Sequence, residues 1–232
     1  EEKNSFEYVL SAAIKEAEKA LANTVYQNPV LEKAGVKFTT LADEPASGNQ
    51  LDFLIGATED TKDQMQAAAN VINGYKTVVF YDPADAKTVK QTYGEYGIEL
   101  ECKAVTYTSY LAELVKSGAL KGENNGKTVV FQDPFQLARD LKETEEPRKV
   151  VAAYATLNEM LCNGKDTMWA GNLLMAQWMP DVMKKVADGR IFNAKGVKAD
   201  TIVTASVSEY AALKSVDQNE VAIISLEELI LG

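Results

Sequence analysis

The chain contains one strand-and-turn pattern twice, and a repeat of this kind restricts the folds that are open to it. Residues 76–83 read KTVVFYDP and residues 127–134 read KTVVFQDP, so seven of eight positions are identical. Four apolar or β-branched residues followed by Asp-Pro are typical of a buried strand that ends in a turn. The same local design is therefore used in two places along the chain.

Two further similarities are offset by about 120 residues, roughly half of the 232-residue chain. Residues 46–51 resemble 169–174, and residues 105–114 resemble 222–229. We therefore expect two similar halves related by a pseudo-two-fold axis, 1–122 and 125–232. The Gly- and Asn-rich run at 121–126 suits the turn between them.

Predicted strands alternate with predicted helices along the chain. The strands are expected at 36–41, 77–81, 128–131, 201–204 and 221–224, with weaker candidates at 6–10, 102–105 and 157–161. The helices are expected at 12–21, 61–72, 86–93, 148–153 and 171–186. Because the strands are mostly apolar, we predict an α/β fold in which each half is a mostly parallel sheet with helices on both faces.

Several helix starts are marked by capping residues. Asp82 and Asp133 each precede a proline, an arrangement in which the carboxylate caps a helix that begins at the proline. Capping boxes, in which a hydroxyl residue is followed three positions later by Glu or Gln, are expected at 61–64, 206–209 and 225–228.

Composition excludes several classes of function. With 34 acidic and 24 basic residues the net charge is −10, which argues against binding to nucleic acid. The chain has no apolar run long enough to span a membrane. It also has no histidine, which removes Ser-His-Asp and Cys-His catalysis and every histidine metal site. Only two cysteines, Cys102 and Cys162, are present, and this favours a reducing cytoplasm.

Segments in both halves follow a pattern known from one protein family. They are residues 31–38 and 107–114 in the first half, and 132–135, 137–139, 146–150 and 199–205 in the second. In this order and spacing the chain resembles the duplicated cysteine-rich (CCG) domain. That domain occurs in heterodisulfide reductases, in glycolate oxidase iron–sulfur subunits and in succinate or thiol:fumarate reductases.

The resemblance implies particular ligand positions. Members of the family carry, in each repeat, a cysteine after the first strand, a Cys-Cys-Gly and a Cys-Pro-x-Cys ahead of a helix, and these thiolates hold iron–sulfur clusters. The first cysteine falls near 11–13 in the first half. The other positions fall on residues without sulfur: Ala46, Ser47, Gly48, Asp82 and Asp85 in the first half, and Phe135, Trp169, Ala170, Gly171, Ser206 and Glu209 in the second.

Neither Cys102 nor Cys162 occupies one of these positions. Since an iron–sulfur cluster needs about four thiolates, we expect no such cofactor and no metal. The resulting hypothesis is a degenerate, cluster-free relative of these oxidoreductase subunits. It would be a non-catalytic structural or partner-binding protein of a redox system, with other subunits of a redox complex as partners.

Two other functions stay open from the sequence. One is a protein that binds a ligand in the cleft between the halves. The ligand would be Ca²⁺ or Mg²⁺, held by the carboxylates of Asp82, Asp85, Asp133 and Glu209. Alternatively, it would be an organic molecule that rests on Phe135 or Trp169. Against this, the acidic residues sit where helix caps belong, and the aromatic side chains could simply fill the volume that a cluster vacated. The other is an electron carrier with an atypical cluster that a second chain helps to supply.

Overall fold

The computed structural model describes residues 28–41, 44–216 and 221–232. The chain divides into two compact units, Glu1–Glu44 and Pro45–Gly232. In the first unit the described helix is α2 (Pro29–Lys33), which Asn28 caps through its side chain. The strand predicted at 36–41 is wrong, because these residues form an irregular segment that none of the described strand pairings includes. The strand predicted at 6–10 and the helix at 12–21 lie outside the described residues.

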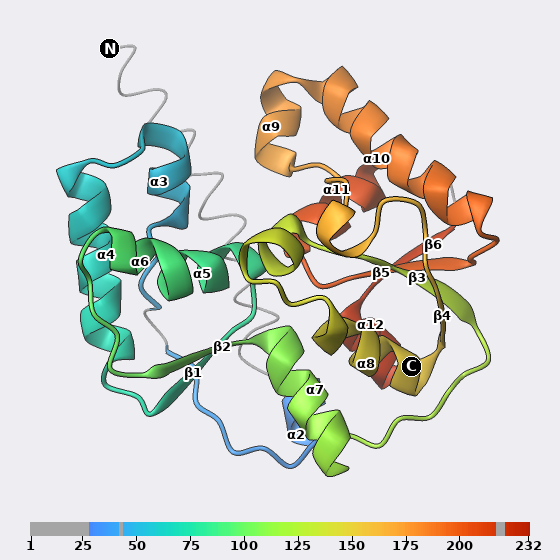
Figure 1. The fold of residues 1–232 in the computed structure, drawn as a ribbon, viewed down its shortest axis with the longest axis horizontal. Coiled ribbons are helices and arrows are strands. Elements are labelled where there is room, and N and C mark those ends of the chain that lie inside the picture. Colours follow the sequence, from blue (N-terminus) through green and yellow to red (C-terminus); the bar gives the residue numbers. More distant parts are fainter. Residues whose placement is uncertain (1–27, 42–43, 217–220) are drawn as a thin grey trace. The chain divides into compact units, whose positions relative to one another are not determined.

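The second unit contains two parallel sheets (Figure 1). The smaller one pairs β1 with β2, and the larger one has the order β4-β3-β5-β6. The strands are β1 (Thr77–Phe80), β2 (Lys103–Thr106), β3 (Thr128–Gln132), β4 (Thr156–Asn158), β5 (Thr201–Thr204) and β6 (Ala222–Ser225). The α/β fold with parallel strands is therefore confirmed, as are strands in the predicted places from residue 77 onward.

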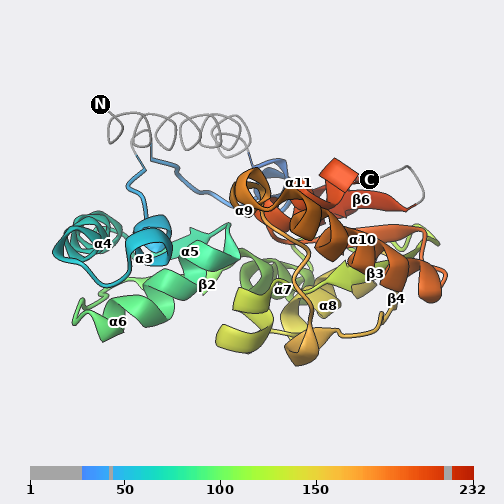
Figure 2. The same ribbon diagram turned by 90° about the horizontal axis from the view of Figure 1, so that it is seen from above.

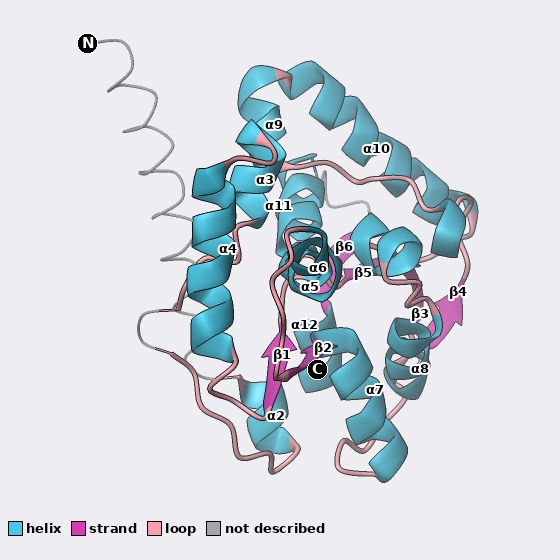
Figure 3. Cartoon of the chain, turned by 60° about the vertical axis from the view of Figure 1, so that its left-hand side comes forward, coloured by secondary structure: helices cyan, strands magenta, loops and turns pink. Residues whose placement is uncertain are grey.

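Helices connect these strands, as parallel pairing requires (Figure 3). They are α3 (Asn49–Ile55), α4 (Glu59–Ile72), α5 (Pro83–Lys87), η1 (Thr88–Thr92), α6 (Tyr93–Glu95), α7 (Tyr107–Ser117), η2 (Gln136–Asp140), α8 (Glu145–Tyr154), η3 (Gly164–Asp166), α9 (Leu173–Trp178), α10 (Pro180–Gly196), α11 (Val207–Val216) and α12 (Leu226–Leu231). The single helix predicted at 171–186 is interrupted, since Met179 leaves the helical region (φ −136°, ψ 60°) before Pro180 starts α10.

The core of the larger sheet follows from the alternation of side chains along its strands. Val130, Ile202 and Ile223 lie at neighbouring positions of three adjacent strands and belong to one buried cluster. Ala187 of α10 and Leu213 of α11 complete that cluster. Figure 1 shows α10 and α11 on one side of this sheet and α8 and α12 on the other.

The smaller sheet has a core of its own. Met65 and Ile72 of α4 pack with Val89 of η1 and Tyr93 of α6, and all four are buried. Val78 and Phe80 of β1 lie against this cluster. Figure 2 shows α3, α4, α5 and α6 gathered beside β2.

Two segments of the chain have the same order of elements. In one segment β1 is followed by the unbroken helical stretch α5–η1–α6, then by β2 and α7; in the other, β5 is followed by the single helix α11, then by β6 and α12. In each segment four consecutive residue pairs join the two strands, Thr77↔Lys103 to Phe80↔Thr106 and Thr201↔Ala222 to Thr204↔Ser225. In both, the last residue of the second strand caps the helix that follows it, Thr106 for α7 and Ser225 for α12.

The predicted caps are only partly present. Asp82 caps α5 by accepting a hydrogen bond from the backbone N–H of Ala84 (2.7 Å), and Ser225 forms a complete capping box with Glu228. The box predicted at 61–64 is wrong, because α4 begins earlier and Thr58 caps it. The cap predicted at Asp133 is also wrong.

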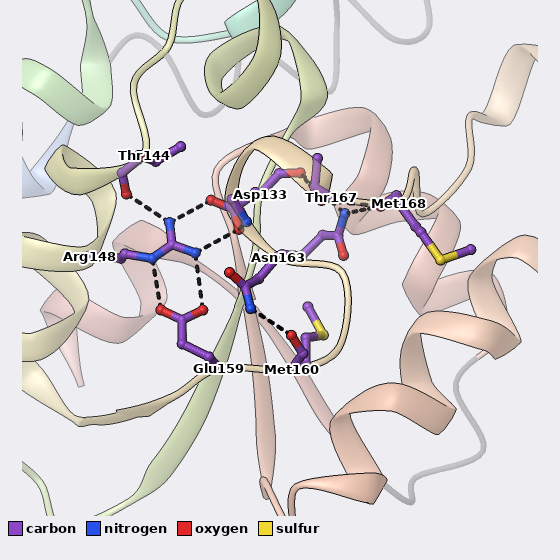
Figure 4. A network of polar contacts seen from close by, with 10 residues as sticks. Asp133, Thr144, Arg148, Glu159, Met160, Asn163, Thr167 and Met168 are labelled. Carbon is purple, nitrogen blue, oxygen red and sulfur yellow. Dashed lines mark hydrogen bonds and ion pairs between the residues drawn. The ribbon is translucent and has the colours of Figure 1, made fainter.

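Asp133 instead holds an arginine (Figure 4). Its carboxylate accepts two hydrogen bonds from the guanidinium of Arg148, at 2.7 and 2.9 Å, and one from the backbone N–H of Gly164 at 2.7 Å. Arg148 also donates to both carboxylate oxygens of Glu159 and to the carbonyl of Thr144. The Asp133 side chain is only 1% exposed, so this bidentate pair is nearly removed from water.

We predict that Asp133→Ala destabilises the protein by about 3 kcal/mol, because it removes a buried bidentate ion pair and leaves the backbone N–H of Gly164 without its acceptor, while Arg148 keeps its pair with Glu159. Removing a residue that only caps a helix would lower the free energy of unfolding by about 1 kcal/mol. Urea unfolding of Asp133→Ala beside Thr58→Ala, which removes a cap and no ion pair, measures the difference. Equal losses in the two variants would contradict the structural role assigned to Asp133.

Candidate functional site

The structure brings two of the first-half positions directly together. The hydroxyl of Ser47, in the loop before α3, donates a hydrogen bond to the carboxylate of Asp85 on α5 at 2.5 Å. The same hydroxyl accepts a bond from the backbone N–H of Asn49 (3.2 Å), and the carbonyl of Ser47 accepts one from Tyr93 (2.9 Å). Hydrogen bonds to Asp85 of α5 and Tyr93 of α6 therefore hold the loop at 46–48 in place.

Gly48 and Ala46 complete this loop. Gly48 has a left-handed backbone (φ +86°), and a Cβ atom there would lie 2.5 Å from Cγ of Met65. Glycine is therefore required for both conformation and space. Ala46 contributes its carbonyl, which accepts a hydrogen bond from Gln64 (3.0 Å).

The two acidic groups at the start of α5 affect each other. Burial is the main reason that the pKa of Asp82 is raised from 3.8 to about 7, and the nearby carboxylate of Asp85 raises it further. Burial also raises the pKa of Asp85, while the hydrogen bond from Ser47 opposes that change. Because its pKa lies near 7, Asp82 is only partly ionised at neutral pH.

A comparable group forms around Glu209. This residue, in the first turn of α11, is 2% exposed, and the backbone N–H of Ala170 and the side chain of Gln132 approach its carboxyl. Gly171, which follows Ala170, also has a positive φ (+112°), and a Cβ atom there would meet Cβ of Ala212 on α11 at 3.2 Å. The loop at 169–171 therefore lies against α11, as the loop at 46–48 lies against α5.

A buried arginine that sequence reasoning did not place in the site lies beside Glu209. Arg190 of α10 is fully buried and donates to the side chain of Gln132 (2.6 Å) and to the carbonyl of Leu161 (3.0 Å). Burial lowers its pKa, which the charge of Glu209 partly offsets. Among the described residues, Nη2 of Arg190 and both carboxylate oxygens of Glu209 have no hydrogen-bond partner of good geometry.

Arg190 was missed because it lies four residues beyond the helix predicted at 171–186, whereas α10 continues to Gly196. The spacing of apolar residues offered one signal that Arg190 is buried. Arg190 lies on the buried side of α10, which also carries apolar residues at helical spacing: Met183, Ala187, Ile191 and Ala194. Gln132 gave no signal, because it follows an apolar strand where a turn residue was expected.

The other predicted site residues take ordinary positions. Ser206 is buried, and its hydroxyl accepts a hydrogen bond from the backbone N–H of Glu209 at 3.4 Å, while Glu209 does not complete the capping box. Phe135 and Trp169 are half-buried. Cys102 and Cys162 are free thiols, and burial raises the pKa of Cys102. The first-cysteine position near 11–13 lies outside the described residues.

One hollow in this unit lies at the carboxyl ends of β1 and β2. It is lined by Phe80, Tyr81, Pro83, Thr106, Tyr107, Thr108 and Leu137, and these side chains leave no room even for a water-sized molecule. Ligand pockets for small organic molecules usually enclose about 300–1,000 Å³, so this hollow is too small to hold one in the described conformation.

The donor atoms at these positions do not fit an iron–sulfur cluster. Ser47 and Asp85 offer a hydroxyl and a carboxyl, and Ala170 and Glu209 offer a methyl group and a carboxyl. Iron–sulfur clusters bind thiolates instead. Within residues 28–41, 44–216 and 221–232, no three acidic or cysteine side chains gather where they could hold a metal ion. No helix in the described part of the chain is both long and apolar enough to cross a membrane.

Comparisons with known proteins add no relative. No protein-family model matches the chain, and no curated protein matches it.

The buried carboxyl of Glu209 predicts a dependence of stability on pH. Burial is the main reason that its pKa is raised from 4.5 to about 8. The folded state therefore keeps a proton that the unfolded state releases above pH 4.5, and the associated stability is lost as pH rises toward 8.

We expect Glu209→Gln, which stays neutral, to be more stable than the wild type at pH 8.5 by on the order of 2 kcal/mol and nearly equal to it at pH 4. Urea unfolding across this range measures both curves. Glu228→Gln is a control on an exposed cap whose carboxyl has no such burial. Parallel curves for Glu209→Gln and the wild type would show that Glu209 is not buried as described.

Proposed function

We propose that this chain is a cluster-free relative of the CCG-domain redox subunits, a non-catalytic structural or partner-binding protein of a cytoplasmic redox system. One observation carries the proposal. In each half, the loop that matches Cys-Cys-Gly meets the helix start that matches Cys-Pro-x-Cys, through Ser47 and Asp85 in one and through Ala170 and Glu209 in the other. Positions that hold thiolates in the family are therefore neighbours here without sulfur.

The order of elements supports a duplicated chain with halves 1–122 and 125–232. In each segment a strand, a helical stretch (α5–η1–α6 or α11), a second strand and a capped helix follow one another, and four consecutive residue pairs join the two parallel strands. Asp82 and Ser206 stand at the same place in these segments, two residues after the first strand. A pseudo-two-fold relation between the halves is the simplest account of these matches.

Several side chains at the former ligand positions are bonded to each other or buried, and this favours a structural or binding role over a catalytic one. Ser47 and Asp85 bond to each other, and the carboxyl of Glu209 is enclosed. Meanwhile large apolar side chains are exposed elsewhere, among them Phe53 and Ile55 of α3 and Phe192 of α10, at 65%, 51% and 74%. Contiguous exposed apolar patches mark surfaces that bind other proteins, and the face of α3 with Phe53 and Ile55 is a candidate for one.

Iron content tests the proposal. We expect the wild-type protein, prepared without oxygen and then incubated with excess iron and sulfide, to hold no stoichiometric iron and to show no visible absorption. Stoichiometric iron in the wild type would contradict it and favour the electron carrier with an atypical cluster.

The family assignment is tested by restoring thiolates. A variant with cysteine at Phe135, Trp169, Ala170, Ser206 and Glu209 should gain iron and visible absorption in the same treatment. A control variant with five cysteines on exposed positions of α4 and α7 should not. A folded restored variant that binds no more iron than the control would argue against the correspondence of these positions.

A second candidate function is the binding of a small polar molecule beside Arg190. The observation that favours it is a pair of buried polar groups that receive no hydrogen bond of good geometry from the described residues, Nη2 of Arg190 on α10 and the carboxyl oxygens of Glu209 on α11. Burying such atoms unpaired costs free energy that a bound carboxylate or amide would recover.

We expect acetate or acetamide to raise the melting temperature of the wild type in a concentration-dependent way, and Arg190→Met to lose that response. Arg139→Met, which removes an arginine bonded to backbone carbonyls, serves as the control. An identical response in all three proteins would mean that the additives act on solvent and not at this site.

A further inference from the structure

The outward face of α10 has features that the described part of the chain does not explain. Helix α10 lies on the outside of the larger sheet (Figure 3). One side of the helix is buried and carries Met183, Ala187, Arg190, Ile191 and Ala194. The opposite side carries Phe192, which is 74% exposed, and Val182, which is 49% exposed. Gly189 lies between them in the middle of the helix.

Gly189 has no role within the described part of its own chain. It does not have a positive φ, and a Cβ atom added there would meet nothing within 4 Å. A glycine inside a helix costs about 1 kcal/mol relative to alanine, so the position is unfavourable without a compensating contact. A glycine on an exposed helix face does, however, allow a second backbone or a large side chain to approach closely.

These residues form one stripe along the helix. At 3.6 residues per turn, Val182, Lys185, Gly189, Phe192 and Gly196 fall within an arc of about 80°. We name them the α10 stripe. A second α10 helix laid antiparallel on it, with the two helices crossing at the level of Ala187, would place Val182 opposite Phe192 and Lys185 opposite Gly189. Each bulky side chain would then meet a smaller one.

The charges beside the stripe agree with the antiparallel arrangement. Asp181, Lys184, Asp188 and Lys195 line one flank of α10, and Lys184 and Asp188 already form an ion pair at 2.6 Å. In the antiparallel pair Asp188 lies within about 3 Å, along the axis, of Lys184 on the other helix, and Asp181 is equally near Lys195.

We propose that the α10 stripe is a self-association surface, and that its partner is a second copy of this chain in an antiparallel two-fold contact. The inference stands on α10 alone and does not depend on what the former cluster positions do. A helix of 17 residues is about 25 Å long, and its area is at the low end for specific interfaces. The dimer should therefore be weak and dependent on concentration.

Sedimentation equilibrium of the full chain, from micromolar to near-millimolar concentrations, tests the proposal. We expect a monomer–dimer equilibrium whose dissociation constant rises at least about tenfold in Phe192→Glu, because each dimer would bury two added charges. Phe53→Glu makes the same substitution at a similarly exposed position on α3 and should leave the constant unchanged. Circular dichroism confirms that both variants fold.

The antiparallel register has a test of its own. Asp188→Lys should weaken the dimer, and the double change Lys184→Asp with Asp188→Lys should restore it, because each charge again meets its opposite across the two-fold axis. A wild type that stays monomeric at every concentration would overturn the proposal. So would equal effects of Phe192→Glu and Phe53→Glu, or a double variant no tighter than Asp188→Lys.

Discussion

The pairing of Asp133 with Arg148 holds together the part of the chain on which the second-half site depends. Asp133 lies in the turn after β3, and its partners lie in α8 and at Gly164 before the loop that contains Ala170. Because that loop has little regular structure, its path is set by such contacts and by the hydrogen bonds of Thr167 and Met168 to the same region. Loss of the pair would release one of the contacts that bring Ala170 to Glu209.

The buried carboxyls carry a high electrostatic cost. Burial raises the pKa of Asp82, Asp85 and Glu209, so each is held in a state that water would not favour. A hydrogen bond from Ser47 relieves this cost at Asp85, while no hydrogen bond of good geometry from the described residues reaches the carboxyl of Glu209. If oxygen has replaced sulfur at these positions, as we propose, the two halves have adapted to the change differently.

Local sequence was a good guide to elements and a poor guide to the roles of polar residues. β1 and β3 were correctly predicted from their apolar runs, because a buried parallel strand needs little more than β-branched residues. Asp82 and Asp133 follow those strands in nearly identical sequences, yet one caps a helix and the other binds an arginine. The difference lies in Arg148, which is fifteen residues away and absent from the corresponding place in the first half.

The sequence by itself determined the α/β class, the positions of most strands and the glycines that the loops at 46–48 and 169–171 require, because hydrophobic period and backbone sterics are local properties. It also determined that the chain has two cysteines and no histidine, because those counts need no structure. Only the tertiary structure decided that Ser47 meets Asp85, that Arg190 is buried beside Glu209, and that Phe192 faces outward. Those facts depend on how distant segments pack, and no window of sequence contains both members of such a contact.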